Sequence, residues 1–153
     1  MPAEMDGPAP SDPYDLQRFI TAQDPVFAQV LGELRAGHKQ SHWMWFVFPQ
    51  IAGLGRSSTA RYYAIRSSEE AAAFLVHPLL GSRLEQCACE VEAIEGRTAR
   101  EIFGSIDALK LHSSMTLFAS VTDQPIFSRV ISRYFDDRPD PATLELIGRP
   151  KGE

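Results

Sequence analysis

Apolar residues recur three and four positions apart along most of the chain, which is the spacing that gathers them on one side of a helix. A clear case lies within residues 24–37, where Asp24 is the expected cap, Pro25 stands in the first turn and Gly37 is the expected stop. Its apolar stripe consists of Val26, Phe27, Val30, Leu31 and Leu34. Further helices are expected within residues 11–23, 52–65, 67–76, 78–96, 98–104, 105–121, 124–135 and 140–148.

Polar residues that cap helices stand where several of these segments begin. Thr98 and Glu101 have the spacing of a capping box, in which each side chain accepts a backbone N–H bond from the other residue. The other expected caps are Ser41, Ser57 or Ser58, Ser67 or Ser68, Ser105 and Asp140.

The segment SHWMWFVFPQ, residues 41–50, is compatible with two conformations. Its aromatic and β-branched residues favour a strand, whereas Ser41 as a cap and Pro49 as a terminator favour a short helix. Nothing nearby offers a partner strand, so we expect a helical turn. The predicted fold is all-α: a compact single domain of about eight short to medium helices, without a sheet of three or more strands.

Length and composition fit one globular domain. The chain has 153 residues, of which 44% are hydrophobic and 23% charged. No apolar run approaches the roughly 20 residues of a membrane span, and the acidic, Pro-rich start does not resemble a signal peptide. We expect a flexible tail at residues 1–12, a helical domain at 13–149 and a C-terminal tail at 150–153. The expected protein is cytoplasmic, a monomer or homodimer, without membrane contact.

The two cysteines, Cys87 and Cys89, are two positions apart and would point to opposite sides of a helix, so they should not pair. We expect buried, reduced thiols, as is usual in the cytosol. His38 and His42 are four positions apart but have no acidic or cysteine neighbour, which is a weak metal signal. We therefore expect neither a metal nor a cofactor.

Charge is distributed unevenly along the chain. The net charge of −5 argues against general nucleic-acid binding. Yet the segment from Leu34 to Ser68, the positive window, contains no Asp or Glu. A local positive field suits a small anionic ligand, unless these cations pair with acids elsewhere in the fold. The basic residues of the window are Arg35, Lys39, Arg56, Arg61 and Arg66.

Within the positive window, the loop GLGRSS has the chemistry of a phosphate site. Gly53 and Gly55 allow backbone N–H groups to approach a ligand closely, and a helix start adds partial positive charge. Arg56 can bind a phosphate or carboxylate through two bonds, and Ser57 adds a hydroxyl. The alternative is an ordinary helix start with an exposed arginine.

Two tryptophans precede this loop. Trp43 or Trp45 would stack on the ring of a ligand, with Gln50 orienting that ring, while the other tryptophan packs in the core. The alternative is that both tryptophans are core residues. His42, one position earlier, is a candidate acid–base group.

A second candidate group comes from residues 105–121. Lys110 and Ser114 share one face of this otherwise apolar helix, and Asp107 extends the face by one turn. A desolvated lysine can act as a base or nucleophile. We expect Lys110 and Ser114 to approach the cleft of His42 and Gln50, unless they form an exposed polar stripe.

Over nearly its whole length, the sequence resembles the bacterial family catalogued as domain of unknown function 1810, whose members are sometimes labelled calpastatin. The segments ELRAGHKQSHWMWFVFPQIAGLGRSSTARYYAI, HPLLGSRL, IFGSIDALKLHSSMTLFA and PDPATLELIG carry the resemblance. It implies a compact, all-helical, cytosolic protein and no particular activity.

SHWMWFVFPQ is also faintly similar to the aromatic helix of YbiA-like N-glycosidases, which act on phosphorylated riboflavin precursors and ADP-ribose-type compounds. Their acidic residue near this motif has no counterpart in the positive window. What this similarity implies is a ligand class. We therefore expect a protein that binds a phosphorylated, ring-bearing small molecule, with glycosidic hydrolysis as its chemistry if it is an enzyme. The alternative is a non-enzymatic interaction protein whose basic face binds an acidic partner.

Overall fold

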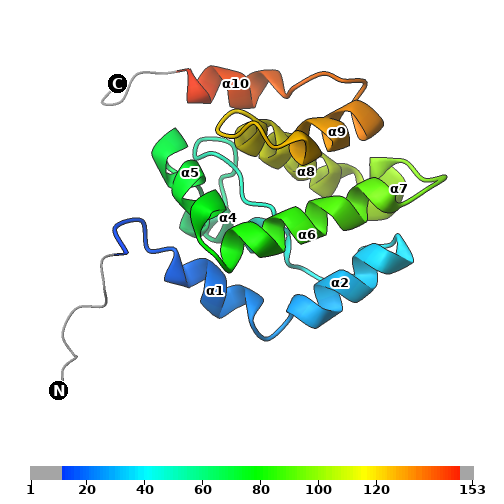
Figure 1. The fold of residues 1–153 in the computed structure, drawn as a ribbon, viewed down its shortest axis with the longest axis horizontal. Coiled ribbons are helices and arrows are strands. Elements are labelled where there is room, and N and C mark those ends of the chain that lie inside the picture. Colours follow the sequence, from blue (N-terminus) through cyan, green and yellow to red (C-terminus); the bar gives the residue numbers. More distant parts are fainter. Residues whose placement is uncertain (1–11, 149–153) are drawn as a thin grey trace.

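In the computed structural model, which describes residues 12–148, ten helices pack around one core (Figure 1). Within these residues the β structure is one isolated parallel bridge between Ile51 and Ile65. The all-α prediction is confirmed, with slightly more helices than expected. They are α1 (Gln17–Gln23), α2 (Phe27–Ala36), α3 (Met44–Val47), α4 (Ser58–Tyr62), α5 (Ser68–Val76), α6 (Leu80–Ala93), α7 (Ala99–Phe103), α8 (Ser105–Ala119), α9 (Pro125–Tyr134) and α10 (Pro141–Ile147).

The helix α8 is the centre of the packing. It contacts α7, α9, α10, α5 and α3, while α6 packs on α2, α5 and α9 (Figure 1). The second half of α8 is buried on several sides, its polar residues Ser113, Ser114 and Thr116 included, because other helices pack around it. The largest fully buried side chains of the core are Trp43, Phe19, Phe48, Phe74, Phe118 and Phe127.

Several expected caps are present. Thr98 and Glu101 form both bonds of the capping box at the start of α7. Ser57, Ser67 and Asp140 accept backbone N–H bonds at the starts of α4, α5 and α10.

Three other cap predictions are wrong, and each of these side chains has a different role or position. Asp24 lies after α1 and pairs with Arg83 at 2.9 Å. Ser41 precedes α3 but donates its hydroxyl to Glu33 at 2.6 Å. Gly104 takes the cap position before α8, so Ser105 is already inside the helix and caps nothing.

Residues 1–11 and 149–153 lie outside the described residues, and with them most of the two expected tails. Asp12 belongs to the folded part, since its carboxylate accepts the backbone N–H groups of Leu16 and Gln17 at 2.8 and 3.0 Å. None of the helices between residues 12 and 148 has the length and apolar content needed to cross a membrane.

Both cysteines of α6 are free thiols. Cys87 is buried, and this burial raises its thiol pKa to about 12. Cys89 is exposed, so the prediction that both are buried is wrong for it. The spacing of two residues places it on the solvent side of α6 when Cys87 faces the core.

Candidate functional site

The two tryptophans lie at the start of the short helix α3. Trp43, just before it, is 1% exposed and donates its indole N–H to Glu33 at 2.9 Å. Trp45, within it, is half-buried and lines two surface hollows. The structure thus divides the tryptophans between core and cleft, as expected.

Glu33 holds the segment before α3 in place. One carboxylate oxygen accepts the backbone N–H groups of Gln40 and Ser41 at 2.8 and 3.1 Å, and the other accepts the Ser41 hydroxyl. Burial alone would raise the pKa of Glu33, but these bonds and the one from Trp43 lower it from 4.5 to about 2. Glu33 therefore fixes the backbone that leads to Trp45.

A second segment, residues 50–66, forms a loop that closes on itself. Ile65 N–H donates to the Gln50 carbonyl at 2.8 Å, and Ala52 N–H donates to the Ile65 carbonyl at 2.7 Å. These two bonds form the parallel bridge next to α4. They bring the chain after Gln50 alongside the chain after Tyr63.

The end of this loop, residues 62–66, is held by a buried ion pair. Arg18 of α1 and Glu70 of α5 form it, with N and O atoms 2.8 Å apart. Arg18 also donates to the carbonyl groups of Tyr62 and Ala64 at 2.9 and 3.0 Å. Glu70 in turn accepts the backbone N–H of Arg66 at 3.0 Å. Two helices distant in sequence thus hold residues 62–66.

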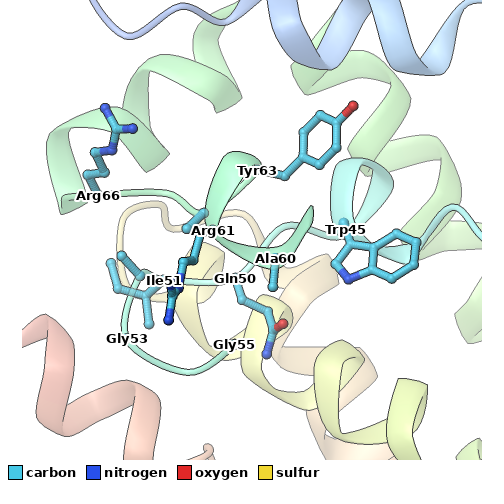
Figure 2. Close-up of a pocket in the computed structure, with 11 residues that line it drawn as sticks. Trp45, Gln50, Ile51, Gly53, Gly55, Ala60, Arg61, Tyr63 and Arg66 are labelled. Carbon is cyan, nitrogen blue, oxygen red and sulfur yellow. The ribbon is translucent and has the colours of Figure 1, made fainter. Parts of the chain in front are cut away.

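The loop and α3 enclose the first hollow, with a volume of about 100 Å³ (Figure 2). Figure 2 shows the nitrogen-bearing ring of Trp45 on the side that faces Ala60 and Gln50. We call this space the arginine hollow. Its lining residues are Trp45, Gln50, Ile51, Ala52, Gly53, Gly55, Ala60, Arg61, Tyr63, Ala64 and Arg66.

The polar lining of the arginine hollow is dominated by hydrogen-bond donors. Arg61 and Arg66 are its two cationic residues, Gln50 carries an amide and Trp45 an indole N–H. Figure 2 shows the guanidinium of Arg66 directed away from Gln50 and Trp45. Burial raises the pKa of Tyr63, and Figure 2 shows its phenol hydroxyl pointing away from Gln50 and Ala60. No carboxylate is among the described lining residues. Such a lining suits an acceptor-rich, anionic group.

The cations of the positive window divide into two sets. Arg35 pairs with Glu90 at 3.0 Å, and Lys39 pairs with Asp107 at 2.8 Å. Within residues 12–148, neither Arg61 nor Arg66 forms an ion pair. Pairing with distant acids therefore accounts for Arg35 and Lys39. Arg61 and Arg66, which line the arginine hollow, pair with no described carboxylate.

The second hollow lies between α3 and the start of α8 and measures about 360 Å³. Asp107 Oδ2 is 2.8 Å from Lys39 Nζ, and Asp107 Oδ1 is 3.5 Å from Lys110 Nζ. Lys110 Nζ also lies 4.6 Å from the ring centroid of Trp45. We call this space the lysine hollow. Its lining residues are Lys39, His42, Met44, Trp45, Phe103, Gly104, Ser105, Ile106, Asp107 and Lys110.

A comparison with protein families decides the identity of the chain. The model of the family described as "Protein of unknown function (DUF1810)" matches residues 13–147. The chain belongs to the DUF1810 family. The DUF1810 chain is also similar to a solved structure, that of the conserved hypothetical protein Rv1873 from Mycobacterium tuberculosis. The two are 51% identical, the match covers 91% of this chain and 100% of that one, and the TM-score is 0.89. No curated protein matches the chain.

In this DUF1810 chain, the single pocket expected from His42, Gln50, Arg56 and Lys110 does not form. Gln50 lines the arginine hollow together with Gly53 and Gly55. His42 and Lys110 line the lysine hollow. Trp45 is the residue that the two hollows share.

Four predicted ligand residues line neither of these hollows. Trp43 is a core residue. Arg56 and Ser57 are exposed. The Ser57 hydroxyl caps α4 by accepting Ala60 N–H at 3.0 Å, so it is already used within the fold. Ser114 is fully buried, and its hydroxyl has no hydrogen-bond partner in the described part of the chain.

Sequence reasoning did not assign Arg61, Arg66 or Asp107 to a binding site. Arg61 and Arg66 carried a signal, since both lie in the positive window, but the bridge that brings their segment alongside Gln50 is a tertiary contact. Asp107 supplies the lysine hollow with the carboxylate that the window itself lacks. Over residues 12–148, no group of three or more His, Cys, Asp or Glu side chains is placed to hold a metal.

Proposed function

We propose that this protein binds a phosphorylated, ring-bearing small molecule, such as a nucleotide or an ADP-ribose-like compound, with its anionic group in the arginine hollow. One observation carries the proposal. Arg61 and Arg66 line a hollow without a described carboxylate, and neither forms an ion pair within residues 12–148. A guanidinium can donate two parallel bonds to a phosphate, which makes arginine well suited to this role.

The sizes of the two hollows indicate how the ligand is distributed. The arginine hollow, about 100 Å³, has the volume of only a few water molecules and suits one phosphate-sized group. The lysine hollow, about 360 Å³, falls in the range of small-molecule sites, roughly 300–1,000 Å³. Since Trp45 lines both, a ligand that reaches from one to the other contacts its indole.

Hydrolysis is a second proposed function, supported by the presence of Asp107 and His42 in the lysine hollow. In a glycosidic cleavage, water would add to the anomeric carbon and lose a proton to one of these groups, while the bond to the leaving group breaks and that group is protonated. Chromatography of ADP-ribose and nucleotides incubated with the protein tests this. Release of the leaving group that is lost in the His42→Ala variant supports hydrolysis, and unchanged compounds refute it.

The binding proposal is tested by calorimetric titration of the protein with AMP and ADP-ribose. Arg61→Ala should weaken binding by about 1.5–3 kcal/mol, the range for hydrogen bonds to charged groups. Arg56→Ala is the matched control, because Arg56 is an exposed arginine of the same loop that does not line the hollow. Its affinity should stay close to that of the wild type.

The alternative function, binding of an acidic protein partner, uses the same arginines as an exposed surface. In that case Arg56 and Arg61 contribute similarly, and small phosphates bind to neither hollow. Equal effects of the two substitutions, or no heat with either compound, would therefore favour the interaction protein over the small-molecule site.

A further inference from the structure

We infer that the lysine hollow selects a hydroxylated sugar ring, so that the ligand class is a sugar phosphate, and an aromatic base contributes little to affinity. This inference rests on the proposed function, because it places the phosphate in the arginine hollow. It concerns the other end of the same ligand.

Asp107 is the first reason. Each carboxylate oxygen has two acceptor positions, and the described contacts are one lysine on each oxygen, at 2.8 Å for Lys39 and 3.5 Å for Lys110. The side chain of Asp107 is 20% exposed, so the remaining acceptor positions are accessible from the hollow. Hydroxyl groups are ligand donors that such a carboxylate accepts, whereas a fully ionised phosphate has no proton to donate to it.

The donors of the lysine hollow are arranged around this carboxylate. Lys110 is held loosely by Asp107, so its ammonium can also donate to a ligand oxygen. Ser105 lines the hollow with a hydroxyl that is not used as a helix cap. His42 is exposed at the rim and can donate or accept, depending on its tautomer. A ring with several hydroxyl groups, each both donor and acceptor, matches this mixture.

Lys110 also limits what can stack on Trp45. Its ammonium lies 4.6 Å from the indole centroid, over the ring. An aromatic base stacking on that face would have to displace the ammonium, whereas a sugar hydroxyl can accept a bond from it. Met44, Phe103 and Ile106 provide apolar contact for the C–H groups of a sugar ring.

The test compares three ligands by calorimetry: inorganic phosphate, ribose 5-phosphate and AMP. Ribose 5-phosphate should bind at least about tenfold more tightly than inorganic phosphate, the gain expected from one hydrogen bond to a charged group. AMP should differ from ribose 5-phosphate by less than about threefold, since its base adds no comparable bond.

Two variants localise the gain to the lysine hollow. Lys110→Met keeps the length of the side chain and removes its charge, and His42→Ala changes an exposed residue. Both should reduce the preference for ribose 5-phosphate over inorganic phosphate while leaving phosphate affinity unchanged. Asp107→Asn should do the same, but Lys39 is buried against it, so its folding is verified first by circular dichroism.

The outcomes separate the two proposals. If inorganic phosphate and ribose 5-phosphate bind equally, the sugar inference is wrong while the arginine hollow stands. If AMP binds more than about threefold tighter than ribose 5-phosphate, the base contributes to recognition and the inference is also wrong. If none of the three binds, the proposed function itself fails.

Discussion

At the scale of single residues, two glutamates at the borders of the positive window organise the site. Glu33 accepts hydrogen bonds from the segment before Trp45, and Glu70 pairs with Arg18 and accepts a bond from Arg66. Both carboxylates are buried and satisfied by several donors. A segment without acidic residues is therefore held by acidic residues just outside it, while Arg61 and Arg66 inside it form no ion pair within residues 12–148.

Glu33→Gln should destabilise the protein by about 1.5–3 kcal/mol, because the new amide carries N–H groups toward backbone donors that need an acceptor. Urea unfolding measures this loss. Glu90→Gln serves as the control, since Glu90 pairs with the mostly exposed Arg35 and its loss should change the midpoint little.

The pH dependence follows from the same carboxylate. Its folded pKa, about 2, is below its ordinary value of 4.5, so its contribution to stability is complete above pH 4.5 and is lost as the pH falls toward 2. The Glu33→Gln variant lacks this contribution. Its stability should therefore fall less steeply than that of the wild type between pH 4.5 and 2, and parallel curves would contradict the assignment.

At the scale of elements, the site is built from α3 and α4, which have four and five residues. Helices this short are not stable alone, so their positions depend on close tertiary packing. Gly55 shows how close this packing is: a Cβ atom there would lie 2.5 Å from Ala60 Cβ of α4. The loop can approach α4 to this extent only with a glycine at this position.

Gly55→Ala should destabilise the protein by about 1–3 kcal/mol, the usual cost of overpacking. Gly32→Ala is the matched control, and it should change the stability in the opposite direction. Gly32 lies inside α2 with no atom within 4 Å of the added Cβ, so alanine should stabilise by about 0.5–1 kcal/mol. Thermal unfolding of both variants compares them directly, and a neutral Gly55→Ala would show that the loop relaxes away from α4.

The difference between local patterns and contacts of distant segments explains which features the sequence could predict. The apolar stripes and caps are local patterns, so the helices and the capping box of Thr98 and Glu101 were predictable. The predicted cap Ser105 is wrong because Gly104 takes the position before α8, and the predicted cap Asp24 is wrong because it ends α1 while α2 begins only after Val26. The two hollows depend on which distant segments meet. No local pattern places Asp107 beside Lys39, or brings Gln50 and Arg61 to the lining of one hollow.

At the scale of the whole molecule, Arg18 connects parts of the chain that are far apart in sequence. It lies in α1, pairs with Glu70 of α5 and donates to carbonyl groups of residues 62 and 64. The two side chains are 5% and 3% exposed, so removing one leaves the other as a buried, poorly compensated charge.

Arg18→Met should therefore destabilise the protein by about 3–5 kcal/mol, the range for breaking a buried ion pair from one side. Arg129→Met is the control, because Arg129 forms an ion pair with Glu92 at the surface, with the same shortest N–O distance of 2.8 Å. Urea midpoints should shift strongly for the first variant and little for the second. A small shift for Arg18→Met would mean that water or a local rearrangement satisfies Glu70.

The parallel bridge between Ile51 and Ile65 has a consequence for how a ligand enters. Its two hydrogen bonds close the loop of residues 52–64, and its two residues, Ile51 and Ile65, are buried in the core. An opening confined to residues 53–61, which are mostly exposed, leaves this bridge intact and requires less free energy than global unfolding. The wall of the arginine hollow can thus separate from its opposite side while α6 and α8 remain packed. A ligand that contacts both sides would bind the closed loop in preference to the open one, and the rate at which the loop opens would limit its release.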